Sequence, residues 1–302
     1  MKVNSKRLFV LTGATAVGKT KEAISLAKTL NTEIISADSR QFYKELNIGV
    51  ARPTKEELLE VKHHFIGHIS IEDNYNAGLF EKDALQRINT LFETYDNLVL
   101  TGGSGMYIDV VCNGIDDLPD VDIKIRNELN KVFKDQGITA LQEELKEKDI
   151  EYYNIVDTKN HIRLIRALEL IRQTGKPFSS YRTNQKAKRD FEIIRFALQR
   201  DRAELIERIN QRVDLMIEEG LVEEARQVYP YRKLSSLNTV GYKELFKYFS
   251  GEISLSEAIE DIKTNTRRYA KRQMTWFRKE ESYTWLNAKE SINWKEVLDD
   301  RK

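Results

Sequence analysis

The stretch that decides the fold is LFVLTGATAVGKTKEA, residues 8–23. It begins with a short apolar run, and residues 13–20 then match the pattern G-x-x-x-x-G-K-[ST]. Between a strand and a helix, this pattern forms a phosphate-binding loop (P-loop), because its glycines let backbone N–H groups approach a phosphate chain and the helix N-terminus adds positive potential. We therefore predict a strand at 8–12, a helix at 19–30, and a site for a phosphate chain between them.

The segments that follow repeat this alternation of apolar runs and amphipathic stretches. Residues 33–37 and 98–101 read as further strands, 77–95 as a helix, and 191–200 as a later return to the sheet. Strands and helices in this order predict a parallel sheet covered by helices, whose ligands bind at the carboxyl ends of the strands. The predicted fold class is α/β, with a P-loop NTPase-like parallel sheet.

The character of the chain changes between these parts. Residues 119–190 are highly charged, read as mostly helical and contain few strand signals. We predict that they form an inserted, all-helical subdomain, and that residues 1–118 and 191–302 form the P-loop core. Long helices are expected at 202–228 and 254–280, in the C-terminal half of that core.

Composition narrows the class of protein. The 302 residues are 40% hydrophobic and 32% charged, with a formal net charge of +1 and a single cysteine, Cys112. One cysteine excludes a disulfide framework and a Cys-cluster zinc site. The sequence contains no run of about 18 apolar residues, so we expect no membrane span. The predicted strand at residue 8 begins too early for a signal peptide to precede it, so we expect none. We expect a cytoplasmic monomer with no obligate protein partner.

Asp38 is the candidate base of the predicted site. It follows the second strand in the order Ser36-Ala37-Asp38-Ser39, which places its carboxylate near the phosphate end of the sheet. It could accept a proton from an attacking hydroxyl or amine; alternatively, it caps the following turn or holds Mg²⁺ through water. The third strand ends in Thr101-Gly102-Gly103 rather than in an acid. A simple ATPase commonly carries a Mg²⁺-ordering Asp there, so this ending counts against ATP hydrolysis.

Two segments concentrate positive charge. Residues 263–279 contain seven Lys or Arg and no acid, with aromatic residues interleaved. Residues 159–189 contain nine Lys or Arg and a single acid, Glu169. Two such patches on a nearly neutral protein indicate a polyanion larger than a nucleotide. Solvated helix faces are an equally good interpretation of the charge alone, and arginines in a kinase lid would give the second pattern too.

Taken together, these motifs resemble the tRNA dimethylallyltransferase (tRNA isopentenyltransferase) family in its shorter bacterial form. The resemblance extends from about residue 8 to residue 286, with the family's blocks in the family's order. The blocks are GATAVGKT, IISADSRQFYKELNIGVARPT, HHFIGHI, YNAGLFEKDA, TGGSGMYIDVVCNGI, NHIRLIRALELIRQTGKP, RINQRVDLMIEEGLVEEA, LNTVGYKEL and RRYAKRQMTWFRK. Ser104 departs from the pattern, because the family usually has Thr there.

The resemblance implies a prenyl transfer. The exocyclic N6 of the adenosine on the 3′ side of a tRNA anticodon, tRNA position 37, would attack C1 of dimethylallyl diphosphate. Diphosphate would leave with the help of Mg²⁺ as cofactor, and the anticodon stem-loop would bind with the target base flipped out of its stack. The partners expected are therefore tRNA and dimethylallyl diphosphate. The P-loop would hold a leaving diphosphate, although the motif itself is one that also binds ATP.

The resemblance also implies a role for particular residues. The catalytic set is Asp38, Lys19, Thr20, Ser104 and Arg212, with Thr20 as the Mg²⁺ ligand. The diphosphate-binding set is Gly13, Ala14, Thr15, Ala16, Val17, Gly18, Lys19 and Thr20. The tRNA-binding set in the core is Asp38, Ser39, Arg40, Gln41, Ser104, Asn238, Thr239, Val240, Gly241, Tyr242, Lys243, Lys271, Arg272, Gln273, Met274, Thr275, Trp276, Phe277 and Arg278. The tRNA-binding set in the helical subdomain is Arg126, Ile162, Arg163, Leu164, Ile165 and Arg166.

Two other functions fit the P-loop and the basic patches. A P-loop small-molecule kinase would use Asp38 to deprotonate a substrate hydroxyl and residues 159–189 as a lid over ATP. A nucleotide-gated RNA-binding protein would bind RNA without changing it covalently. Transfer of label to tRNA from dimethylallyl diphosphate, from ATP or from neither separates these functions.

Overall fold

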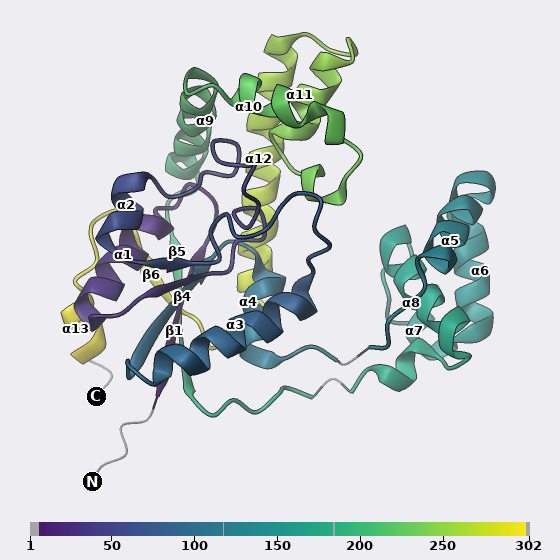
Figure 1. Ribbon diagram of the computed structural model, residues 1–302, viewed down its shortest axis with the longest axis horizontal. Helices are drawn as coiled ribbons and strands as arrows, with labels where there is room; N and C mark the ends of the chain where they lie inside the picture. Colours follow the sequence, from purple (N-terminus) through teal and green to yellow (C-terminus); the bar gives the residue numbers. More distant parts are fainter. Residues whose placement is uncertain (1–5, 117, 184, 300–302) are drawn as a thin grey trace. The chain divides into compact units, whose positions relative to one another are not determined.

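The structure is a computed structural model that describes residues 6–116, 118–183 and 185–299. The described residues divide into two compact units (Figure 1). The core unit consists of the residues before Gly114 and those from Lys188 onward, and Gly114–Ala187 form the helical unit. The predicted boundaries at 118/119 and 190/191 lie a few residues later, and the predicted outer limits, residues 1 and 302, lie outside the described residues.

The core unit is built on a parallel sheet. Its described strands follow the order β3-β2-β4-β1-β5-β6, and every neighbouring pair is parallel. Their bounds are β1 Arg7–Gly13, β2 Ile34–Ser36, β3 His63–His64, β4 Asn97–Gly102, β5 Glu192–Gln199 and β6 Thr284–Asn287. The α/β prediction is confirmed, and the four predicted strands are present. Both edge strands, β3 and β6, went unpredicted because two and four residues carry too little periodic signal.

Helices cover both faces of the sheet, as an all-parallel sheet requires. Side chains of β1 alternate between them: Leu8 and Val10 pack with α3 (Ala77–Phe92) and α4 (Gly105–Asn113). Phe9 and Leu11 pack with α1 (Lys19–Leu30) and α13 (Trp294–Asp299). Buried on both sides, β1 reads as the continuous apolar run seen in the sequence.

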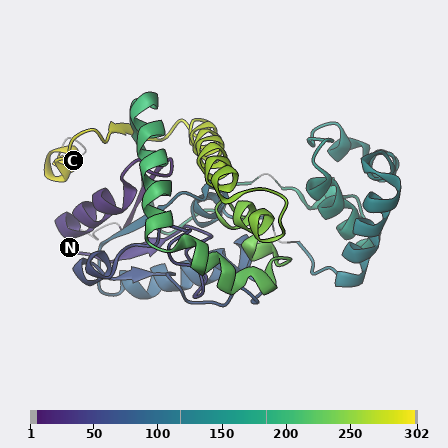
Figure 2. The same cartoon turned by 90° about the horizontal axis from the view of Figure 1, so that it is seen from above.

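A second group of helices packs beyond the carboxyl ends of the strands, where it meets the loop after β1. The group consists of α9 (Arg202–Glu218), α10 (Leu221–Val228), α11 (Tyr242–Phe249) and α12 (Leu255–Phe277), and a short helix, α2 (Lys55–Glu60), precedes β3. Ala14 and Ala16 of the P-loop pack against Ile209 of α9 and Ala270 of α12. Figure 2 shows α12, in yellow-green, beside α9, in green, and α12 carries one of the basic segments.

The long helix predicted at 202–228 is wrong as a single element. It is divided into α9 and α10, because Gly220 adopts φ +102°, a conformation that side-chain-bearing residues rarely take. The helix predicted at 254–280 is α12, which begins after Ser254 and ends at Phe277. Ser254 accepts a hydrogen bond from the N–H of Glu257, and the Glu257 carboxylate accepts one in return, which makes a capping box.

The helical unit has its own apolar core. It contains α5 (Ile123–Gln136), α6 (Ile138–Lys148), α7 (Ile150–Tyr153) and α8 (His161–Thr174). Leu129, Leu141, Leu145, Leu164 and Leu168, which come from three of these helices, are fully buried together. Because the apolar side chains of the helical unit pack with one another, the basic residues of α8 lie at the surface of the unit. Among the described residues, no helix has both the length and the apolar character needed to cross a membrane.

Candidate active site

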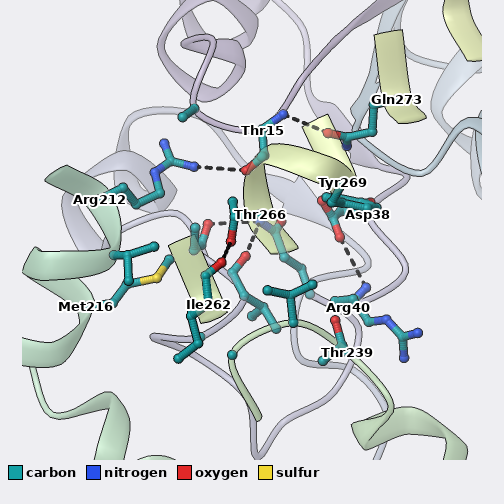
Figure 3. Close-up of a pocket in the computed structure, with 18 of the residues that line it drawn as sticks. Thr15, Asp38, Arg40, Arg212, Met216, Thr239, Ile262, Thr266, Tyr269 and Gln273 are labelled. Atoms are coloured by element: carbon teal, nitrogen blue, oxygen red, sulfur yellow. Dashed lines mark hydrogen bonds between the residues drawn. The ribbon is translucent and has the colours of Figure 1, made fainter. Parts of the chain in front are cut away.

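One cavity of about 400 Å³ opens at the carboxyl end of the sheet in the core unit. The P-loop, residues 38–41 after β2, and residues 49–51 line it, together with residues of α9, of the 238–243 segment and of α12. Figure 3 shows Thr15 of the P-loop, Asp38, Arg212 and Tyr269 around this space. Segments that lie up to about 260 residues apart in the chain therefore meet at one site.

The P-loop takes the backbone conformation that its sequence predicts. Gly13 and Gly18 have φ +151° and +113°, and Ala16 has φ +64°. A Cβ on Gly13 would lie 2.8 Å from the carbonyl oxygen of Leu198, so only glycine fits between β1 and β5. The loop then leads into α1 at Lys19.

Lys19 is the central cation of the site. Its Nζ donates hydrogen bonds to the carbonyl oxygens of Gly13 at 3.0 Å and Ala14 at 2.8 Å. Burial lowers the pKa of Lys19 from 10.5 to about 8, the nearby Asp38 carboxylate opposes this fall, and Arg212 adds to it. An anionic ligand beside Nζ would favour the protonated amine again.

Three arginines, one just after β5 and two in α9, reinforce the positive charge around the P-loop. The Nε atom of Arg208 donates to the carbonyl oxygen of Ala16 at 2.8 Å, and Nε of Arg200 donates to that of Val17 at 2.8 Å. Nη1 of Arg212 lies 3.5 Å from Oγ1 of Thr15, and burial followed by the Arg208 charge lowers the pKa of Arg212. Sequence reasoning found Arg212 and missed the two arginines that hold the loop's carbonyl groups.

Asp38 lies at the cavity wall opposite Arg212 (Figure 3). Its Oδ1 accepts a hydrogen bond from the N–H of Arg40 at 3.1 Å, which makes the turn-capping contact that was the alternative to a base. Lys19 lines the same cavity, and the Asp38 charge raises the pKa of Lys19 against the effect of burial. The cap occupies one carboxylate oxygen, so capping the turn and accepting a proton are compatible.

Ser104 supports the segment that follows Asp38. Its Oγ accepts from the N–H of Ser39 at 3.0 Å and lies 3.0 Å from Oγ of Ser39. Burial raises the pKa of the neighbouring Tyr269 to about 12, and the Asp38 charge adds to this rise. The hydroxyl expected at position 104 is therefore engaged with the protein, where it holds the Asp38 turn against the loop after β4.

Gln273 connects α12 to both of these loops. Its Oε1 accepts from the N–H of Thr15 at 2.8 Å, and its Nε2 donates to the carbonyl oxygen of Gly103 at 2.8 Å (Figure 3 shows the first bond). The side chain is 5% exposed. The sequence placed Gln273 among the tRNA contacts, which stays a prediction, and in the structure its amide holds the P-loop and the Gly103 loop together.

Glu224 is a further positioning residue that sequence reasoning missed. Its carboxylate accepts from the N–H groups of Asn47, Ile48 and Gly49 at 2.8–3.0 Å and from the Tyr242 hydroxyl at 2.6 Å. These bonds fix the loop that lines the cavity at residues 49–51. No local pattern could have found this carboxylate, because more than 170 residues separate it from the loop.

Several residues assigned to tRNA contact have buried side chains. Tyr242 is 0% exposed, Phe277 1%, Leu164 0% and Ile165 6%, because each packs into an apolar core. Their side chains therefore support this surface from below, and a tRNA contact at these positions stays a prediction. Other members of the predicted set lie at the surface, namely Asn238, Lys243, Lys271, Arg272, Thr275, Trp276, Arg278, Ile162 and Arg163.

The comparisons with known proteins agree with this arrangement. The family model described as IPP transferase matches residues 41–280. The tRNA dimethylallyltransferase 2 of Parabacteroides distasonis is 52% identical over 277 residues, which are 92% of this chain and 93% of that protein. The tRNA dimethylallyltransferase of Christiangramia forsetii is 52% identical over 91% of each chain.

Solved structures give the same result. The full-length tRNA isopentenylpyrophosphate transferase of Bacillus halodurans superposes with a TM-score of 0.71 at 36% identity, covering 98% of this chain and 94% of that one. A eukaryotic dimethylallyltransferase acting on tRNA gives a TM-score of 0.79 at 25% identity, covering 98% and 77%. The chain belongs to the IPP transferase family. The family predicted from the motifs is confirmed, and neither the kinase nor the RNA-binding alternative is supported.

Proposed function

We propose that this chain transfers the dimethylallyl group of dimethylallyl diphosphate to N6 of the adenosine on the 3′ side of a tRNA anticodon, tRNA position 37. The observation that carries the proposal is a single cavity, in a member of the IPP transferase family, that joins a P-loop to the Asp38 carboxylate. Such a cavity can hold a diphosphate next to an acceptor amine.

The P-loop, Lys19 and Arg212 would hold the diphosphate. Backbone N–H groups of residues 13–20 and the start of α1 supply hydrogen bonds and positive potential. Lys19 lies at the bottom of this loop, and Arg212 approaches from α9. Charge builds up on the diphosphate as the C–O bond breaks, so these cations stabilise the transition state more than the bound substrate.

Asp38 would act on the acceptor amine. The N6 lone pair forms the new bond to C1 of the dimethylallyl group, and the electrons of the broken C1–O bond leave with the diphosphate. The amine then carries an extra proton, which passes to the free oxygen of the Asp38 carboxylate. The other oxygen stays with the N–H of Arg40, so the residue is held in place during the transfer.

The donors near Lys19 fit Mg²⁺. Thr20 and Asp38 line the main cavity and also a smaller one of about 40 Å³ that continues toward Thr101. Hydroxyl and phosphate oxygens are hard ligands of the kind that Mg²⁺ prefers. We infer that Thr20 would hold the ion together with the diphosphate, where the ion would supply further charge neutralisation for the leaving group, while the free oxygen of Asp38 stays available for the proton.

Apolar side chains give one wall of the cavity low polarity. Val213 and Met216 of α9, Leu221 of α10 and Ile262 of α12 line it. Figure 3 shows Met216 and Ile262 on the side of Arg212. A hydrocarbon with no hydrogen-bonding group is accommodated there without leaving polar groups unpaired. We infer that this wall receives the dimethylallyl group and keeps water from the reacting carbon.

The exposed cations would bind the RNA backbone. Lys243, Lys271, Arg272 and Arg278 lie at the surface of the core unit, and Lys243 and Arg272 also line the cavity. Phosphate contacts of this kind position an RNA without reading its sequence. Arg40 differs from these four cations, because its guanidinium already bonds the protein and donates to the carbonyl oxygen of Ser236 at 2.8 Å.

One experiment tests the proposed reaction. The protein is incubated with unmodified tRNA, Mg²⁺ and either labelled dimethylallyl diphosphate or γ-labelled ATP, and the tRNA is digested to nucleosides. We expect the label of the dimethylallyl group to appear on a single adenosine of the tRNA. Diphosphate should be released in an equal amount. Label from ATP alone, or from neither donor, would contradict the proposal.

A further inference from the structure

Glu169, the single acid among the basic residues 159–189, has an unusual environment in the helical unit. It lies on α8 and is 0% exposed. Its Oε2 accepts from Nε of Arg126 at 2.6 Å, and its Oε1 accepts from Nη2 of Arg126 at 2.6 Å and from Nη1 of Arg166 at 2.5 Å. One buried carboxylate thus binds two guanidinium groups, one of them through both oxygens.

The two arginines remain accessible while the carboxylate does not. The side chains of Arg126 and Arg166 are 47% and 40% exposed. Burial alone raises the pKa of Glu169, but the hydrogen bonds from Arg126 and Arg166 bring it below its ordinary value. The carboxylate therefore stays ionised, and the trio carries one net positive charge on the outer side of the cluster.

We propose that Glu169 is a positioning residue that holds Arg126 and Arg166 side by side as a site for RNA phosphate. Guanidinium groups pre-organised in this way lose little side-chain freedom when a phosphate binds, which favours affinity. The outward N–H groups can donate to phosphate oxygens while the inward ones stay with Glu169. This inference rests on the proposed function, because it names the substrate's backbone as the ligand.

The same helix offers a matched contrast. Arg172 donates to Glu144 through Nε at 2.8 Å and Nη2 at 2.6 Å, and its Nη1 lies 4.0 Å from Glu128. Arg172 thus faces two carboxylates, whereas two arginines share Glu169. The Arg172 pair has no excess of positive charge, so it serves as the structural control for the Glu169 site.

The test compares Glu169→Gln with Glu144→Gln in the full chain. Both substitutions remove one negative charge, so a pure charge effect strengthens tRNA binding in both. If Glu169 positions the arginines, Glu169→Gln instead weakens tRNA binding by about three- to tenfold, because the Gln amide has one accepting oxygen and its NH₂ group would face the Nε–H of Arg126, which now donates to Oε2. Glu144→Gln keeps or strengthens binding. Equal affinities for the two variants, or tighter binding by Glu169→Gln, overturn the proposal.

The salt dependence of binding separates phosphate contact from a merely structural role. We expect the slope of log affinity against log salt to fall by about 0.7–1 in Glu169→Gln, as for the loss of one phosphate contact, and to stay unchanged in Glu144→Gln. In turnover, Glu169→Gln should raise the KM for tRNA and leave kcat unchanged. An unchanged salt slope, or a fall in kcat alone, contradicts the proposal.

A second pair of variants covers the case in which Glu169→Gln fails to fold. Arg126→Lys keeps the charge but loses the bidentate contact with Glu169. Because the Arg126 side chain is half-exposed, we expect this variant to fold. Arg172→Lys is its control. We expect weaker tRNA binding only for Arg126→Lys, and equal binding by both variants overturns the proposal. Product formation by the unchanged protein tests the reaction separately, so failure of the arginine site and failure of the proposed function are distinguishable.

Discussion

Binding of inorganic diphosphate should depend on pH through Lys19. The pKa of Lys19 is lowered from 10.5 to about 8 in the ligand-free site. Relative to an ordinary lysine, the site therefore disfavours the charged amine by about 3 kcal/mol. Below pH 8 the amine is already protonated, so binding takes up little proton. Near pH 9 about nine-tenths of the free protein carries neutral Lys19. Binding then takes up nearly one proton, and the affinity falls by up to about tenfold relative to pH 7.

Isothermal titration calorimetry measures both quantities. Inorganic diphosphate is titrated at pH 7, 8 and 9 in buffers of different ionisation enthalpy, which gives the affinity and the number of protons taken up. Lys19→Met is the control, because it shows the pH dependence that comes from ionisation of the diphosphate itself. If the unchanged protein and Lys19→Met follow the same pH dependence, Lys19 is not the titrating group and the reasoning is refuted.

Lys19 should also make the free energy of unfolding depend on pH. Between pH 8 and 10.5 the unfolded chain binds a proton at Lys19 that the folded chain lacks, so the free energy of unfolding rises with pH in this window. At pH 7 the buried charge costs stability, and Lys19→Met should melt at a higher temperature than the unchanged protein. The difference should shrink as the pH approaches 10. A difference that stays constant contradicts this assignment.

Three other substitutions test the site. Asp38→Asn keeps the cap on Arg40 but removes the base, so we expect kcat to fall by ~10²–10⁴-fold with tRNA affinity nearly unchanged; an equal collapse of tRNA affinity in a filter-binding assay would make Asp38 a binding residue. Gln273→Ala leaves the N–H of Thr15 and the carbonyl of Gly103 without this partner, which should destabilise the protein by about 1–3 kcal/mol in urea unfolding and raise the KM for dimethylallyl diphosphate; an increase confined to the KM for tRNA would show that Gln273 acts on the RNA. Replacing Lys271 and Arg272 with Ala should weaken tRNA binding and reduce its salt slope by about 1–2, and an unchanged slope excludes them as phosphate contacts.

The amino-acid sequence by itself determined the fold class, the P-loop and the family. All three follow from short contiguous segments, because the order and spacing of their residues determine the local backbone structure. Residues 8–23 combine an apolar strand, glycines at positions of positive φ and a helix start, so the local pattern is enough. Asp38 could be placed near the phosphate end for the same reason, because parallel strands all end at one edge.

Only the tertiary structure decided which polar side chains face the substrate and which hold the site together. Gln273 and Glu224 both bond loops 170 or more residues away in the chain, and no local periodicity reports such contacts. In the sequence, Glu169 was only the exception in a basic segment, and its burial beneath two arginines required the packed helices. Periodicity and motifs are properties of neighbouring residues, whereas hydrogen bonding across the fold depends on where the core brings distant segments together.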